Sequence, residues 1–279
     1  MPGGQVTAHH GPVKLRVHPI LRELRALYDV GERNTLDRYW AYKRLMVDGP
    51  ELLPLGDFSP MGQRQPGYLD ALIEMNAEAV AAVCAREIEA ELVNSPAEFR
   101  LMLVVADQPR NGWTQRWLTD AAWRFGPEQR PGPSPDRRGV KARSWTAGER
   151  WVTIQVWTHV PPAFMYLRSE LRCAAMRSIW RGKHGGPVTL ADMMAQEGAA
   201  LRFGGGLFAG APLALAADEL DYTREVLAPY RHSDHWPSCF AALYGDEAAR
   251  EVGFPPLGLS AVAGLGVALH EEAARTQPL

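Results

Sequence analysis

The longest regular pattern in the chain is an apolar stripe over residues 67–93. Leu, Ile, Val and Cys side chains recur there at steps of three and four residues, which places them on one face of an α-helix. The same spacing predicts helices over residues 18–30, 34–47, 113–125 and 162–181. Further helical patterns fill the second half of the chain, over residues 189–203, 217–228, 237–244, 246–252 and 260–275. The chain is therefore predicted to be mostly helical.

Three short segments have the pattern of β-strands instead. Residues 99–105 (FRLMLVV) are apolar almost throughout, which is typical of a buried strand. Residues 140–146 and 149–158 flank the pair Ala147-Gly148, and this spacing predicts a β-hairpin. A two-stranded ribbon alone is marginally stable, so the hairpin is expected to pair with the first strand. We therefore expect an α+β fold with a small antiparallel or mixed sheet of about three strands, flanked by helices.

Alternation along residues 149–158 separates two faces of that strand. One face carries three aliphatic residues, Val152, Ile154 and Val156. The other face carries Trp151, Thr153, Gln155 and Trp157. Such alternation indicates one dry face and one face that is partly solvated or lines a ligand. The region is rich in tryptophan, with six of the nine tryptophans of the chain between Trp113 and Trp157. Tryptophan clusters form either a core or a stacking surface for a ligand. The helix and strand periodicity of these tryptophans, beside aliphatic residues, favours a core.

The domain organisation follows from where the predicted sheet lies in the chain. Helices from both ends of the sequence bracket it, so we expect a single compact domain over residues 13–275. A separate helical sub-lobe over residues 187–275 is the alternative. Residues 1–12 are predicted to be a flexible tail, and residues 126–139 (GPEQRPGPSPDRRG) a flexible proline-rich insertion.

Composition narrows the class of protein. Apolar residues make up 46% of the chain and charged residues 22%, which are ordinary values for a globular protein. The net charge of −2 does not indicate a nucleic-acid partner. The three cysteines lie far apart and form no CxxC pair, which excludes a disulfide framework and favours a reducing compartment. No apolar run is long enough to span a bilayer. These features predict a cytoplasmic protein without a membrane partner, and they are compatible with a homo-oligomer.

A polar segment follows the predicted strand 99–105. Ligands of α/β proteins often bind outside the carboxyl ends of strands, so this segment is a candidate site. We interpret Asp107 as a general base or metal ligand. Arg110 can hold an anion in a two-pronged contact, and Asn111 can donate a hydrogen bond. The alternative is a simple turn, because Asp, Pro, Asn and Gly all favour turns.

The principal hypothesis combines this segment with the aromatic face of the strand 149–158. Trp151, Gln155 and Trp157 would form the wall of a pocket. Asp107 would act as the base or a metal ligand, and His159 as a second acid or base. The protein would then be an enzyme or a binding protein for a small anionic metabolite. No Walker A sequence, HExxH, kinase signature or nucleophile elbow occurs in the chain. The reaction is therefore not indicated by any of these motifs.

Two other hypotheses remain open. His232, His235 and Cys239 have types and spacing compatible with zinc or another divalent metal, although a polar loop with a core cysteine is the interpretation we favour. A non-catalytic assembly subunit is the third hypothesis, suggested by the helical bulk and by loop aromatics at Phe58, Phe208 and Trp236.

The predicted helix 162–181 carries an excess of positive charge. Its arginines include the pairs Arg168/Arg172 and Arg177/Arg181, each four residues apart, against the single acid Glu170. Like charges at this spacing destabilise an isolated helix. We expect the acidic face of helix 67–93, formed by Asp70, Glu74 and Glu78, to compensate them. Contact with an anionic ligand or a nucleic acid is the alternative.

Overall fold

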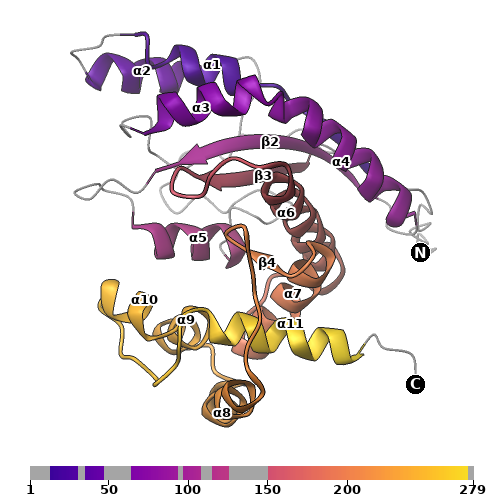
Figure 1. Ribbon diagram of the computed structural model, residues 1–279, viewed down its shortest axis with the longest axis vertical. Helices are drawn as coiled ribbons and strands as arrows, with labels where there is room; N and C mark the ends of the chain where they lie inside the picture. The colour runs from indigo at the N-terminus through magenta and orange to yellow at the C-terminus, as the bar shows by residue number, and fades with distance from the viewer. Residues whose placement is uncertain are drawn as a thin grey trace, which may run out of the picture.

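The computed structural model describes residues 13–30, 35–46, 64–93, 97–107, 115–125 and 150–275. Within them, three strands form a parallel sheet in the order β1-β2-β3 (Figure 1). Their bounds are Lys14–Val17 for β1, Glu98–Ala106 for β2 and Arg150–Trp157 for β3. A separate antiparallel pair consists of β4 (Leu207–Phe208) and β5 (Ala211–Pro212).

The prediction of an antiparallel or mixed sheet is only roughly right. Strand β3 matches the predicted segment 149–158, but its neighbour is β2, and the two run parallel with Leu101 opposite Val152 and Leu103 opposite Ile154. Alternation within one strand reveals its two faces and says nothing about the direction of its neighbour, which is why the parallel pairing of β3 with β2 was not predicted. The predicted partner strand 140–146 lies outside the described residues.

The first strand was not predicted at all. Strand β1 is four residues long and pairs with β2, with Leu15 opposite Phe99. It is the edge of the sheet, and the backbone N–H of Leu15 donates to Glu89 Oε1 at 2.6 Å. This carboxylate satisfies an edge donor that the sheet leaves unpaired. The predicted helix 18–30 is correspondingly short and becomes α1 (Leu21–Ala26).

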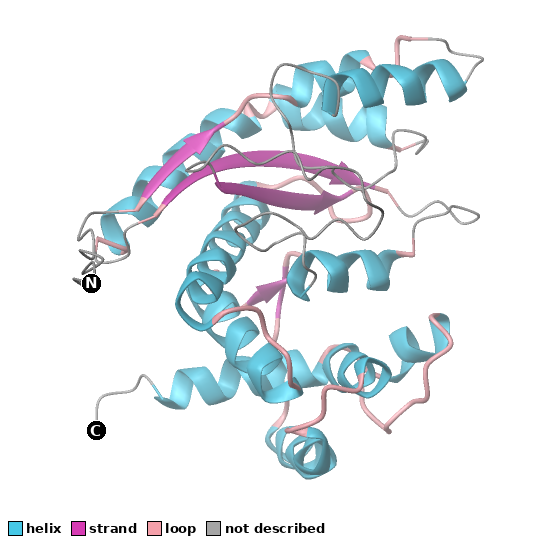
Figure 2. Cartoon of the chain, turned by 180° about the vertical axis from the view of Figure 1, so that it is seen from behind, coloured by secondary structure: helices cyan, strands magenta, loops and turns pink. Residues whose placement is uncertain are grey.

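The N-terminal helices lie on one side of the sheet and α5 on the other (Figures 1 and 2). Their bounds are α2 (Thr35–Met46), α3 (Gln65–Glu74), α4 (Ala77–Glu91) and α5 (Arg116–Phe125). The predicted helix 67–93 is real but is broken into α3 and α4 at Asn76, which adopts a left-handed conformation with φ 56° and ψ 47°. Asparagine tolerates this conformation better than most residues.

The rest of the described chain is mainly helical, as predicted. The helices are α6 (Phe164–His184), α7 (Leu190–Phe203), α8 (Ala217–Leu227), η2 (Ala228–Tyr230), α9 (Trp236–Tyr244), α10 (Asp246–Glu251) and α11 (Ala263–Arg275). A capping box begins α7: the Thr189 side chain accepts from the Asp192 N–H, and the Asp192 carboxylate accepts from the Thr189 N–H. None of the described helices combines the length and the apolar character that crossing a bilayer requires.

The buried apolar residues form two clusters. The first surrounds the sheet and includes α1 to α4. The second lies among α7 to α11 and covers much of the predicted sub-lobe, where the loop aromatics Phe208 and Trp236 are partly buried against it. Helix α6 belongs to both clusters, since Leu167 and Leu171 pack in the first and Cys173 in the second. The region where α5 and α6 meet β3 is therefore the junction of two cores.

Candidate functional site

The carboxyl ends of β2 and β3 bring Asp107, Thr158 and His159 to the same edge of the sheet. Asp107 is 2% exposed. Its Oδ1 accepts a short hydrogen bond from Thr158 Oγ1, and its Oδ2 accepts from the Arg64 N–H at 3.3 Å. One carboxylate oxygen thus joins the ends of β2 and β3, and the other joins β2 to the start of α3. Asp107 is where the sequence placed it, but it is less available as a base than expected.

His159 lies beside Trp157, with the two ring centroids 5.9 Å apart. The pKa of His159 is lowered to about 4, chiefly by partial burial and then by the guanidinium groups of Arg116 and Arg64. The Asp107 carboxylate opposes these effects. The imidazole is therefore neutral at neutral pH and can accept a proton or a hydrogen bond there.

Only some of the other residues predicted for this site lie near it. Arg110 and Asn111 lie outside the described residues. Trp151 is at the far end of β3, where the Arg100 guanidinium stacks on its ring at 4.4 Å and His18 meets it edge-on. Gln155 and Trp157 do line pockets. The predicted wall of three residues therefore contributes two of them to the candidate site.

The structure does not assemble the predicted metal ligands. Cys239 is fully buried, and its Sγ donates to the Ser233 carbonyl. His235 is exposed, with Nδ1 bonded to Ser238 Oγ at 2.9 Å, and His232 is exposed as well. In the part of the chain that the structure describes, no three His, Cys, Asp or Glu side chains are grouped so that they could hold a metal ion. The geometry therefore favours the alternative of a polar loop with a core cysteine.

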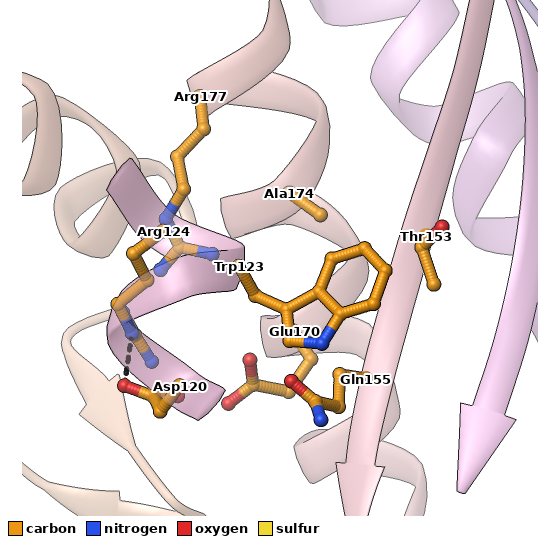
Figure 3. A pocket seen from close by; sticks show the side chains of 8 residues that line it. All are labelled: Asp120, Trp123, Arg124, Thr153, Gln155, Glu170, Ala174 and Arg177. Atoms are coloured by element: carbon orange, nitrogen blue, oxygen red, sulfur yellow. Dashed lines mark hydrogen bonds and ion pairs between the residues drawn. The ribbon is translucent and has the colours of Figure 1, made fainter. Parts of the chain in front are cut away.

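The best-formed group of converging polar side chains lies at the junction of the two cores, between β3, α5 and α6 (Figure 3). Two adjoining pockets there share Asp120, Arg124 and Glu170. The first pocket is also lined by Trp123, Thr153, Gln155, Ala174 and Arg177. The second is also lined by Arg116, Trp117, Trp157, Tyr166, Phe208 and Ala209. We refer to the two together as the junction cleft.

One wall of the junction cleft is a buried ion network centred on Glu197. Its Oε2 accepts from Arg124 Nη1 at 2.6 Å, and its Oε1 accepts from Arg177 Nε at 2.7 Å. Burial alone would raise the pKa of Glu197, but the two guanidinium groups lower it. Arg124 Nε also donates to Asp120 Oδ2 at 2.7 Å, and the Tyr244 hydroxyl donates to the same oxygen at 2.9 Å. Both arginines of the first pocket are thus already neutralised.

Glu170 is the acid that this network leaves out. Its carboxyl points into the junction cleft (Figure 3) and forms no hydrogen bond or salt bridge with any described residue. Burial raises the pKa of Glu170, and Asp120 and Glu197 add to that effect. Arg124 and Arg177 act in the opposite direction. A partly buried carboxyl with a raised pKa in a cleft is suited to give or take a proton.

Gln155 faces the same pocket from β3. Both polar atoms of its amide, Nε2 and Oε1, are inaccessible to water and have no hydrogen-bond partner among the described residues. Buried amides are nearly always bonded, so this one needs an explanation. Since both ends of the amide are unpartnered, turning it over does not remove the problem.

The second pocket supplies a hydroxyl and a cation. Tyr166 Oη accepts from the Trp157 N–H at 3.2 Å, which leaves the Tyr166 proton available. The Arg116 guanidinium lies over the Trp117 ring at 4.3 Å and forms no salt bridge with a described residue. Burial lowers the pKa of Arg116. This end of the junction cleft can hold a polar or anionic substituent.

Free space in the junction cleft is limited. Each pocket leaves room for roughly one water molecule between its side chains. A ligand with a ring therefore has to displace a side chain. The half-buried Trp123 indole, which lies across the first pocket in Figure 3, is the one best placed to move.

Sequence reasoning found β3 but missed the junction cleft, because the network joins side chains of three different helices that lie 20 to 73 residues apart in sequence. A signal was nevertheless present. Glu170 is the single acid of the basic helix α6. Its basic neighbours have partners elsewhere, and an isolated acid among satisfied arginines is a group to test first.

Comparisons with family models, with curated proteins and with solved structures found no match for this chain. The assignment of a function therefore depends on the geometry of the site alone.

Proposed function

We propose that this protein binds a small polar metabolite in the junction cleft and acts on it as an acid–base enzyme, with Glu170 as the proton-transferring group. The observation that carries this proposal is Glu170 itself, a partly buried carboxyl that lines both pockets without a bonding partner among the described residues. A carboxyl serving only stability would be paired, as Glu197 is.

The surroundings of Glu170 fit this role. Its raised pKa brings the carboxyl closer to neutral pH, where a group that both gives and takes protons is most effective. Tyr166 and Gln155 offer hydrogen bonds to a bound molecule on either side. The junction of two cores is also a usual place for ligand sites.

The proposal keeps the sheet face favoured by the sequence and changes the residues. Asp107 is bound through both oxygens, so Glu170 takes its place as the leading catalytic candidate. His159 stays a second candidate at the adjacent strand edge. Binding of an anionic ligand would require Arg116, because Arg124 and Arg177 are already paired with acids.

A ligand screen tests the proposal. The shift in melting temperature of the wild-type chain would be measured against a library of neutral, carboxylate and phosphate metabolites, each relative to the ligand-free protein. We expect stabilising compounds whose effect is lost in Glu170→Gln and kept in Glu74→Gln, which alters an exposed acid on α3. A library without a stabilising compound, or hits indifferent to Glu170→Gln, would contradict the proposal.

A further inference from the structure

The amide of Gln155 presents one donor and one acceptor to the same pocket. Nε2 and Oε1 are both shielded from water and unbonded among the described residues. The side chain extends from β3, whose backbone is fixed by its parallel pairing with Val104 opposite Gln155. The two groups are therefore held side by side at a set spacing, on a rigid element.

A ligand that satisfies both groups must carry an acceptor next to a donor. A cis-amide edge, with C=O and N–H on the same side, has this arrangement. It occurs in primary carboxamides, ureides and lactams, including the pyrimidine-dione ring. Glutamine pairs in the same two-pronged way with the donor and acceptor of adenine in nucleic-acid recognition.

Charges in the pocket favour a neutral ligand at this end. Arg124 is bonded to Asp120 and Glu197, and Arg177 to Glu197. Neither guanidinium is available for an anion, and a cation would lie against both of them. An uncharged amide edge satisfies Gln155 without disturbing these pairs.

We propose that Gln155 is the specificity-determining residue of the junction cleft and pairs with the cis-amide edge of a small neutral carboxamide, ureide or lactam. This inference rests on the proposed function, since it names the class of molecule on which Glu170 acts. Thr153 and Trp123 line the same pocket and bound the space around the amide edge.

Saturation-transfer NMR with the full chain tests this pairing. The probes are acetamide and uracil, which are small carriers of the edge. The matched controls are N,N-dimethylacetamide and 1,3-dimethyluracil, which keep the carbonyl and lack the N–H. We expect acetamide and uracil to bind and the methylated controls not to bind. Gln155→Met should weaken binding about tenfold or more, since two hydrogen bonds are lost.

Stability of the ligand-free variant gives a second readout. Gln155→Met removes two polar atoms that have no partner among the described residues, so its melting temperature should equal or exceed that of the wild type. A clear drop would mean that an ordered water or another group already satisfies the amide, and would overturn the inference. If this variant does not fold, Gln155→Glu keeps the shape and removes the donor, and it should also lose the probes.

Different results would overturn this inference and the proposed function. Equal binding of probes and methylated controls, or unchanged affinity in Gln155→Met, overturns the pairing. If other compounds from the wider screen still depend on Glu170, the proposed function stands. If neither probe binds the wild type, the pairing is overturned as well.

Discussion

At the scale of single residues, the acids of the junction cleft differ in the hydrogen bonds that their neighbours donate to them. Glu197 takes two guanidinium groups, and Asp120 takes the remaining Nε of Arg124 together with a tyrosine hydroxyl. Glu170 receives no hydrogen bond from a described residue, so burial dominates and raises its pKa. The pKa of Glu170 is therefore raised while that of Glu197 is lowered, although the two carboxyls lie at the same helical junction. In acid–base sites, such a difference in environment gives similar groups different roles.

The raised pKa predicts how Glu170→Gln changes stability with pH. In the folded chain Glu170 retains a proton that the unfolded chain, with an ordinary pKa of 4.5, has released. The stability of the wild type therefore falls as pH rises above that value, up to the folded pKa. Glutamine does not titrate, so Glu170→Gln should match the wild type at about pH 4 and melt at a higher temperature at about pH 8.

Melting curves across this pH range measure the difference. Glu74→Gln is the control, because Glu74 is exposed on α3 and its substitution should give a flat difference. A Glu170→Gln variant that is less stable than the wild type at neutral pH would show that the ionised carboxyl has a stabilising partner, contrary to the structure.

At the scale of elements, the basic helix α6 is stabilised by pairs to other helices, as its charge pattern predicted. Arg168 Nε donates to Glu87 Oε2 at 3.0 Å, and Arg172 holds Glu91 with two hydrogen bonds of 2.8 and 2.7 Å. These acids belong to the predicted helix 67–93, but neither is on its predicted acidic face. Arg177 pairs instead with Glu197 of α7, a partner that the sequence did not indicate.

The buried and exposed pairs of α6 should differ in strength. Glu197→Gln leaves Arg177 and one arm of Arg124 uncompensated in a dry environment, and we expect it to lower the free energy of unfolding by about 3–5 kcal/mol. Glu87→Gln removes a pair whose acid is 38% exposed, and about 0–1 kcal/mol is expected. Urea denaturation of both variants measures the contrast. Equal losses would mean that the network of Glu197 is not a structural anchor.

Glycines in helices provide a second contrast between elements. A Cβ on Gly264 of α11 would lie 2.9 Å from the Ala242 carbonyl carbon and 3.0 Å from Leu243 Cα of α9. The two helices are therefore packed closely at this glycine. On α6, a Cβ on Gly182 would meet nothing within 4 Å.

Alanine substitutions at these two positions should therefore have opposite signs. Gly264→Ala forces α9 and α11 apart and should cost about 1–3 kcal/mol. Gly182→Ala only restricts the unfolded chain and should stabilise by about 0.5–1 kcal/mol. Thermal or urea unfolding distinguishes them, and a neutral Gly264→Ala would mean that the contact between α9 and α11 is looser than described.

At the scale of the whole molecule, the sequence predicted what depends on local pattern. The helical majority, the buried strand β2 and the two faces of β3 all follow from the spacing of apolar residues. Parallel pairing with β1 did not, because four residues carry too little pattern to predict a strand and partner choice is not local. Glu170, Asp120 and Gln155 meet only through that tertiary arrangement, so the predicted site shared the sheet face and missed the helices opposite.

The same arrangement predicts that the two cores open together. Helix α6 packs in both clusters, and the network of Glu197 links α5, α6 and α7 at the boundary between them. Separating the cores would expose two arginines and an acid that are bonded only while the cores stay together. The free energy of opening should therefore be the same on both sides.

Buried cysteines report on each core separately. Cys84 lies in the first cluster and Cys239 in the second, and both are fully buried and reduced. Thiol labelling in low denaturant, resolved by peptide mass spectrometry, gives an opening free energy for each. We expect equal values in the wild type and a lower value for one cysteine in Glu197→Gln, because that variant weakens the boundary. Unequal values in the wild type would show instead that residues 187–275 form a lobe that opens independently.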